Sequence, residues 1–283
     1  MRVRHLNCGT HCPLGGSFYD GASKGFLADI CTHCLLIETD RGLVLIDTGY
    51  GLQDVRAPHA RLPWLWPAIL NIRLCEEDTA LRQIEALGFA AADVRHIVLT
   101  HLDFDHAGGL EDFPLARVHV LAREREAAEA KRRGFVANQR YRPKQWDDVR
   151  DWRVYEPDGE GWMGFGAVRA LDGLPPEILM LPLAGHTLGH AGVAIGAADG
   201  WLLHAGDAYL HSAQMLDHPH MPPGLAVYQH IMDADRAARR KNVARLAALK
   251  RERPDVTIFC SHDSAELAAL QQKERAISKP APA

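Results

Sequence analysis

Four potential metal ligands are concentrated in one short stretch of this chain, Thr100-His101-Leu102-Asp103-Phe104-Asp105-His106-Ala107-Gly108-Gly109. The preceding β-branched run, His96-Ile97-Val98-Leu99, predicts a buried strand. Two histidines and two aspartates therefore stand where a strand ends and the chain turns. His101 and His106 are five positions apart, so a helix would separate them by roughly 140° and could not present both on one face. A loop can aim all four side chains at one point.

The residue types in this stretch suit a metal ion. Neutral imidazoles and carboxylates are the ligands that transition metals bind in proteins. The alternative is a capped turn, in which an Asp near a helix start accepts backbone N–H bonds. A capped turn explains one Asp, but it does not explain four ligand-type residues in six positions. The stretch therefore indicates a metal site.

Length and charge exclude several classes of protein. The chain has 283 residues, a net charge of -4 and no basic block, which argues against nucleic acid as a partner. The start carries no apolar signal-peptide segment, and no run approaches the ~20 apolar residues of a membrane span, so no membrane is expected as a partner. We expect a cytoplasmic protein with a single domain over residues 1–275 and a flexible tail at 276–283. A homodimer stays open.

The six cysteines allow two interpretations. Four of them have the spacing of a zinc knot: Cys8, Cys12, Cys31 and Cys34. However, Cys34 opens a strand pattern, and small cysteines are often buried in strands. We therefore expect reduced, buried thiols, with Cys75 and Cys260 in the core.

Short strands alternate with helices along the rest of the chain. The pattern predicts strands at residues 34–39, 43–46, 96–99, 118–121, 168–171, 178–181, 193–195, 201–204 and 256–260, and helices at 76–87, 122–133, 235–253 and 264–275. Loops are predicted over most of 1–30, 52–75 and 210–232. Residues 134–166 are rich in aromatic and charged side chains and indicate an insertion or lid. Elements alternating in both halves indicate a layered α/β protein.

Potential ligands follow directly at the ends of several predicted strands, at His101–His106, His186, Asp207 and His262. If these strand ends share one edge, the ligands meet at one place. Two metals roughly 3.5–4 Å apart, bridged by a carboxylate and a hydroxide, fit the number of ligands. Asp47 ends another strand, where it either holds a ligating histidine through the second ring nitrogen or closes an Asx turn.

Together these residues resemble the metallo-β-lactamase superfamily, whose signature is H-x-H-x-D-H followed by a distant His, Asp and His. The resemblance extends from Asp47-Thr48-Gly49 to His262. It implies an α/β fold, an αββα sandwich of two mixed β-sheets flanked by helices. It also implies two ligand sets that share Asp207: His101 and His186 for the first metal, and Asp105, His106 and His262 for the second.

Asp103 departs from this signature, because the family usually has its second His there. Either Asp103 ligates as a carboxylate, or the first site is weak and the protein holds one metal. Diiron members of the family carry a Glu at this position. Two divalent cations less three carboxylates and a hydroxide leave a neutral site, which would acidify water less and favour iron or manganese over zinc alone. We expect Asp103 to ligate and two divalent metal ions to bind, zinc first, with iron or manganese as alternatives.

The segment Gly185-His186-Thr187-Leu188-Gly189-His190 resembles the N-acyl homoserine lactonases, which open a lactone ring in bacterial signals. The resemblance implies a quorum-quenching hydrolase that attacks a small-molecule lactone or related ester with a metal-bound hydroxide. In that reaction Asp105 orients the attacking water. Tyr209 either clamps the carbonyl oxygen or packs at a strand end. Trp64, Trp66 and residues 134–166 form a substrate wall, core or a dimer surface.

Other classes of activity compete with ester hydrolysis. A thioester hydrolase of the hydroxyacylglutathione type would share the metal set, but no distinct basic cluster that could bind glutathione follows residue 262, although Lys273 and Arg275 are there. A diiron redox enzyme is favoured by Asp103, although a flavodiiron enzyme needs a flavin domain for which this sequence has no room. A binding module with an idle site is the third class.

Overall fold

The computed structural model describes residues 1–130, 135–167, 171–197 and 200–277. Its strands form two sheets, one of seven strands in the order β4-β1-β2-β3-β5-β6-β7 and one of four in the order β11-β10-β9-β8. The larger sheet contains β1 (Arg2–His11), β2 (Ile30–Thr39), β3 (Gly42–Ile46), β4 (Ile72–Arg73), β5 (Val94–Val98), β6 (Arg117–Leu121) and β7 (Trp152–Tyr155). The smaller contains β8 (Ile178–Pro182), β9 (Ala191–Ala197), β10 (Gly200–His204) and β11 (Val256–Phe259). Both sheets mix parallel and antiparallel pairs.

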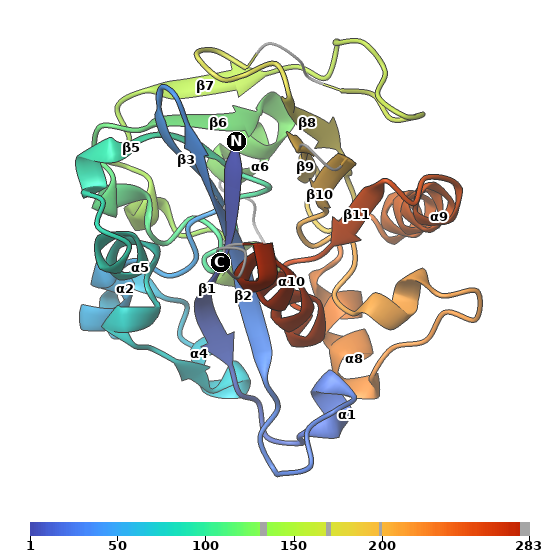
Figure 1. Cartoon of the computed structure of the whole chain (residues 1–283). Helices are drawn as coiled ribbons and strands as arrows, with labels where there is room; N and C mark the ends of the chain where they lie inside the picture. Colours follow the sequence, from blue (N-terminus) through green and yellow to red (C-terminus); the bar gives the residue numbers. More distant parts are fainter. Residues whose placement is uncertain (131–134, 168–170, 198–199, 278–283) are drawn as a thin grey trace, which may run out of the picture.

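Helices pack around the two sheets (Figure 1). They are α1 (Ser17–Asp20), α2 (Leu52–Arg56), α3 (Pro58–Arg61), α4 (Trp66–Leu70), α5 (Ala80–Ala86), α6 (Ala122–Glu129), α7 (Phe135–Arg140), α8 (Pro223–Met232), α9 (Arg236–Glu252) and α10 (Ser264–Ile277). Short 3₁₀ turns lie at η1 (Glu76–Asp78), η2 (Ala91–Asp93), η3 (Leu110–Asp112), η4 (Pro143–Gln145) and η5 (Ser212–Met215).

Alternation along the strands builds the layers. Leu35 and Ile37 of β2 pack with β8 and β9 residues in a core between the sheets, because successive strand side chains point to opposite faces. Leu36, between them, packs on the other face with Ile84 of α5. On the far side, the outer face of the smaller sheet packs against Leu246 of α9. The expected αββα sandwich is therefore confirmed.

Several elements differ from the sequence-based predictions. The chain start contains β1, a long strand that the sequence pattern did not predict because it includes Gly9 and two buried histidines, His5 and His11. Residues predicted as loops include α8, whose Pro223 occupies the first helical turn, where a missing N–H costs nothing. The predicted loop at 52–75 folds into α2 to α4, and the helix predicted at 76–87 is divided between η1 and α5.

The segment at 134–166 is only partly separate from the sandwich. Its β7 pairs in parallel with β6 as the edge strand of the larger sheet, so this part belongs to the sheet and not to an insertion or lid. The strand predicted at 168–171, the end of the helix predicted at 122–133 and most of the predicted tail lie outside the described residues.

The cysteines are all free thiols. Cys260 is buried as expected, but Cys75 is half-buried and donates to Glu77 on the surface, so its assignment to the core was wrong. Within the described ranges, no cysteine joins a cluster of metal-ligating side chains. None of the described helices has the length and apolar character needed to cross a bilayer.

One buried histidine makes the fold sensitive to acid. His119 on β6 contacts His96 and Tyr155, and burial first, with the charge of His96 second, lowers the pKa of His119 to about 3. The folded state therefore keeps this ring neutral while the unfolded chain takes up a proton below pH 6.5. The contribution of the neutral His119 ring to the free energy of unfolding is present above that pH and is lost as the pH falls toward 3.

The free energy of unfolding of the parent protein should fall between pH 7.5 and pH 5. We predict that this fall is smaller by about 2 kcal/mol in His119→Gln. Urea unfolding of the metal-free proteins at both values measures this difference. His218→Gln, at an exposed position, is the control and should leave the loss unchanged. Equal losses for the parent and His119→Gln would contradict a neutral, buried His119.

Candidate metal centre

Asp47 fixes the loop that follows β5. It follows β3 directly, with a left-handed φ of 55°, a conformation that Asp tolerates better than most residues. Its two carboxylate oxygens accept hydrogen bonds from the backbone N–H and the hydroxyl of Thr100, both at 2.7 Å. This contact ties the end of β3 to the first residue of the ligand-rich stretch.

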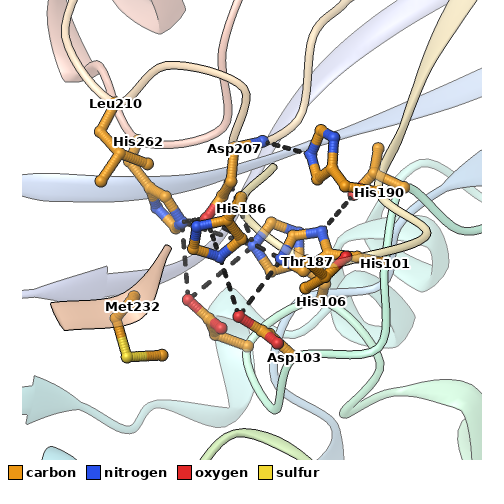
Figure 2. Close-up of polar contacts among 12 residues, drawn as sticks. His101, Asp103, His106, His186, Thr187, His190, Asp207, Leu210, Met232 and His262 are labelled. Atoms are coloured by element: carbon orange, nitrogen blue, oxygen red, sulfur yellow. Dashed lines mark hydrogen bonds and ion pairs between the residues drawn. The ribbon is translucent and has the colours of Figure 1, made fainter. Parts of the chain in front are cut away.

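The structure brings the seven predicted metal ligands together, as Figure 2 shows for those that it labels. All seven are buried, and they come from the loops after β5, β8, β10 and β11: His101, Asp103, Asp105, His106, His186, Asp207 and His262. His101 and His262, which are 161 positions apart in the sequence, thus face one small volume. The strand ends place them there, in agreement with the convergence expected from the sequence.

The first group surrounds a point between two carboxylates and two imidazoles. Oδ2 of Asp103 lies 3.0 Å from Nε2 of His186 and 3.5 Å from Nε2 of His101. Oδ2 of Asp207 lies 3.4 Å and 3.9 Å from the same two nitrogens. Asp103 therefore reaches as far into the centre as a ligand would.

The second group shares Asp207 with the first. Nε2 of His262 lies 3.2 Å from Oδ2 of Asp207, 3.6 Å from Oδ2 of Asp105 and 3.4 Å from Nε2 of His106. Nε2 of His106 lies 3.4 Å from Oδ1 of Asp207 and 3.9 Å from Oδ2 of Asp105. Asp207 thus presents one oxygen or the other to both groups.

These separations fit a shared cation better than direct hydrogen bonds. Hydrogen bonds between N and O span about 2.7–3.2 Å, and most of the separations are longer. Four ligands at about 2.0–2.1 Å from a tetrahedral zinc ion lie roughly 3.3–3.4 Å from one another. Nε2 of His101 and Oδ1 of Asp207 are buried and have no hydrogen-bond partner among the described residues, which is costly unless a cation contacts them. The donor set therefore fits two divalent metal ions.

The opposite ring nitrogens hold the imidazoles in place. Nδ1 of His106 bonds the carboxylate of Asp47 at 2.9 Å, and Nδ1 of His262 bonds the carbonyl of Cys31 at 2.7 Å. Nδ1 of His101 bonds the hydroxyl of Thr100 at 2.8 Å. Protons on these outer nitrogens leave the Nε2 lone pairs facing the centre, as metal ligands require. Of the two interpretations of Asp47, the structure favours the one in which it holds a histidine.

The buried carboxylates of the centre favour a positive charge nearby, as the pKa values of the surrounding groups indicate. Burial alone would lower the pKa of His106, but Asp207, Asp105 and Asp47 outweigh it and raise the pKa to about 10. Burial likewise acts to raise the pKa of Asp207, and nearby histidines hold it well below its usual range. Buried carboxylates in excess draw protons to the rings when no other cation balances them.

Arg140 was missed by the sequence reasoning. This buried guanidinium places Nε 3.3 Å from Oδ1 of Asp103, and its other nitrogens donate to the backbone carbonyls of His186 and Met232 at 2.7 and 2.5 Å. Against the effect of burial, its charge keeps the pKa of Asp103 well below the usual range. The centre therefore has one more positive charge than expected, and the predicted neutral site was wrong.

His11 was also missed, because the chain start was predicted to be loop. It ends β1 beside the second group, with Nε2 3.7 Å from Oδ2 of Asp105 and 2.7 Å from the hydroxyl of Tyr50. Its ring lies 5.6 Å from that of His262. A histidine at a strand end was the available signal.

Glu124 is another exception to the sequence-based interpretation, which placed the charges of the helix at 122–133 on a solvated face. It is fully buried. Its carboxylate accepts from the backbone of Leu102 and Gly189 and from the hydroxyl of Thr187. It thus links the loop of the central stretch to the loop that carries His186.

The structure does not bring Tyr209 to the ligands. Its hydroxyl donates to the carboxylate of Glu266 at 3.1 Å, and its ring packs in the core outside the smaller sheet. The packing alternative fits these contacts, and the carbonyl clamp does not. Tyr228 of α8 lies beside the centre, where it lines a small cavity together with His11 and His262.

Known proteins resemble this chain over most of its length. The family model for the metallo-beta-lactamase superfamily matches residues 32–262. A probable metallo-hydrolase of Mycobacterium tuberculosis is 40% identical over 264 residues, covering 93% of this chain and 80% of that protein. An N-acyl homoserine lactonase of a Bacillus species is 26% identical over 189 residues, covering 65% of this chain and 68% of that protein.

The structural comparison agrees on the fold. A solved N-acyl homoserine lactone hydrolase superposes with a TM-score of 0.71 at 21% identity, over 95% of both chains. Members of the superfamily bind divalent metal ions, typically two, and the clusters of histidine and aspartate described above offer sites for them. With the family match spanning both sheets and every predicted ligand, the chain belongs to the metallo-β-lactamase superfamily and is a metallohydrolase.

Proposed function

We propose that this chain is a dinuclear metallohydrolase that opens a lactone or a related ester with an apolar acyl group. The observation that carries the proposal is the meeting of seven buried ligands at separations suited to two cations that share Asp207. Two bound divalent ions would polarise a carbonyl group and provide a nucleophilic water at neutral pH. Bacillus N-acyl homoserine lactonases are relatives of this chain, which supports a lactone as the ester.

The cavity beside the centre favours an acyl chain. His262 and His11 line it on one side, and the rest of its lining is mainly apolar or aromatic: Tyr19, Ile30, Leu70, Leu210, Leu225 and Tyr228. Figure 2 shows Leu210 near His262. The volume of this cavity is only about 20 Å³, so an acyl chain would contact the lining only after the side chains around it move apart. Trp64 and Trp66, for which a substrate wall was one of three alternatives, do not line this cavity. Trp64 is 74% exposed, and Trp66 is buried in the core.

Two residues have proposed roles in the reaction. Asp105 presents Oδ2 between His262 and His11 at 3.6 and 3.7 Å, where it can orient the attacking water and accept its proton. Tyr228 is held by edge-to-face packing on Trp66, with ring centroids 5.6 Å apart. Its hydroxyl can donate to the carbonyl oxygen as negative charge develops there.

The glutathione thioester alternative gains no support from the cavity beside His262. Lys273 lines a different cavity, together with His5 and Trp201. The lining of the cavity at the centre offers no lysine or arginine to a carboxylate of glutathione. Thioesters therefore serve as a comparison substrate.

Hydrolysis tests the proposal directly. Protein loaded separately with zinc, manganese or iron is assayed on acyl homoserine lactones of several chain lengths, on the corresponding alkyl esters and on acyl glutathione thioesters. We expect the highest kcat/KM on lactones or esters with longer acyl groups. Asp105→Asn should lower kcat by about 100-fold or more, since a positioned base contributes roughly 10²–10⁴-fold. Absence of hydrolysis with every metal would refute the proposal.

Metal content tests the role of Asp103. The parent protein should hold two zinc ions per chain at saturation, and Asp103→Ala should hold about one, because the first site loses a ligand. Elemental analysis after dialysis measures both. Asp54→Asn, which removes another fully buried carboxylate, is the matched control and should retain two ions. One ion in the parent, unchanged in Asp103→Ala, would show that Asp103 does not ligate.

Two tyrosine variants separate the proposed clamp from the packing residue. Tyr228→Phe should lower kcat/KM by about 10–100-fold, because it removes one donor to the developing oxyanion. Tyr209→Phe should cost stability and leave kcat/KM within about twofold, since its hydroxyl donates to Glu266 and not to the centre. The reverse pattern would restore the expectation for Tyr209 and remove Tyr228 from the reaction.

A further inference from the structure

Arg140 is almost completely buried, which is rare for an arginine. It is 3% exposed and lies at the end of α7. Its two terminal nitrogens donate to the carbonyls of His186 and Met232, and Nε lies 3.3 Å from Oδ1 of Asp103 as an ion pair without hydrogen-bond geometry. Met232 and Asp103 lie on the same side of the cluster in Figure 2.

The two oxygens of the Asp103 carboxylate therefore have different neighbours. Oδ1 faces the guanidinium, while Oδ2 faces Nε2 of His186 and Nε2 of His101 at 3.0 and 3.5 Å. An arginine is protonated at all accessible pH values, so it is a fixed positive charge. A buried charge of this kind is stable only beside an opposite charge, and Asp103 provides it.

The charges explain why the two residues occur together. Two divalent cations carry four positive charges, and Asp103, Asp105 and Asp207 carry three negative ones. With a histidine at position 103, two carboxylates would remain, and the centre would be more positive by one charge. Arg140 supplies that missing charge from outside the ligand set.

We propose that Arg140 is a positioning residue that compensates the charge of Asp103, so that the Asp103–Arg140 pair replaces the neutral histidine of the superfamily signature. The inference rests on the proposed dinuclear centre. It makes the affinity of the first site depend on the sum of the charges at positions 103 and 140. It also removes the argument from charge that Asp103 favours iron or manganese.

The test is a double-mutant cycle with zinc alone as the probe. Dissociation constants for the first and second ion are measured on folded, metal-free protein by competition with a chromogenic chelator. Arg140→Gln should bind the first ion about tenfold more tightly or better, since a unit charge is removed near the cation. Asp103→His should bind it about tenfold more weakly.

The double variant Asp103→His with Arg140→Gln should return to within about threefold of the parent, because the two charge changes cancel. Arg140→Lys keeps the charge and should also stay within about threefold. If Arg140 has only a structural role, the change in zinc affinity has the opposite sign. Loss of its bonds to His186 and Met232 would loosen the first site, so Arg140→Gln and the double variant would both bind zinc more weakly, and this result would overturn the inference.

Two further measurements keep the test decisive. Cobalt(II) spectra report the coordination of the first site, and the double variant should show the same band positions and intensities as the cobalt-loaded parent. Arg239→Gln, which breaks the buried ion pair with Asp233, controls for the loss of a buried arginine and should leave both affinities unchanged. If Arg140→Gln does not fold without metal, the zinc affinities of Arg140→Lys and Asp103→His still test the inference, because only Asp103→His changes the charge.

The outcomes also separate this inference from the proposed function. A parent protein that binds no zinc contradicts the dinuclear centre itself. A parent that binds two ions and hydrolyses esters, while Arg140→Gln binds zinc more weakly, contradicts only the charge compensation.

Discussion

Three buried carboxylates facing one another are the constraint on which the centre depends. Asp103, Asp105 and Asp207 are each less than 5% exposed, and carboxylates withdrawn from water are costly unless cations meet them. Arg140 meets Asp103. The histidines offer lone pairs or, when protonated, charge. In the proposed dinuclear centre, two divalent cations would balance the remainder, and they would also explain why ring nitrogens approach one another at 3.4 Å.

The sandwich supplies the rigidity that such a cluster needs. The ligands stand on loops, but each loop begins at the end of a strand buried in the core. Side chains outside the ligand set then connect the loops. Asp47 ties β3 to the central stretch, Glu124 ties that stretch to the His186 loop, and His190 accepts from the backbone N–H of Asp207 at 2.8 Å. Ligand positions are thus fixed before any ion arrives, which favours tight binding.

Sequence reasoning succeeded where the chemistry is local. The spacing of His101, Asp105 and His106 and the recurrence of ligands at strand ends pointed to the seven residues that the structure brings together. Alternating apolar residues gave most strands, because burial on two faces leaves a clear pattern. Helices such as α8 escaped prediction, since their prolines and histidines resemble a loop.

What the sequence could not reveal comes from long-range packing. Arg140 lies 37 positions after Asp103, in a segment whose composition indicated only an insertion. Tyr228 and His11 reach the cavity because α8 and β1 pack beside the centre, and no local pattern specifies that packing. Tyr209 was considered as a carbonyl clamp because it lies two residues after Asp207 in the sequence, but its side chain packs in the core.

The central claim is that one pair of cations, sharing Asp207, holds these side chains together. Anomalous diffraction at the zinc absorption edge, from crystals of zinc-loaded protein, tests it most directly. The account predicts two peaks roughly 3.5–4 Å apart, one between His101 and His186 and one between His106 and His262. A single peak, or two peaks away from Asp207, would contradict it.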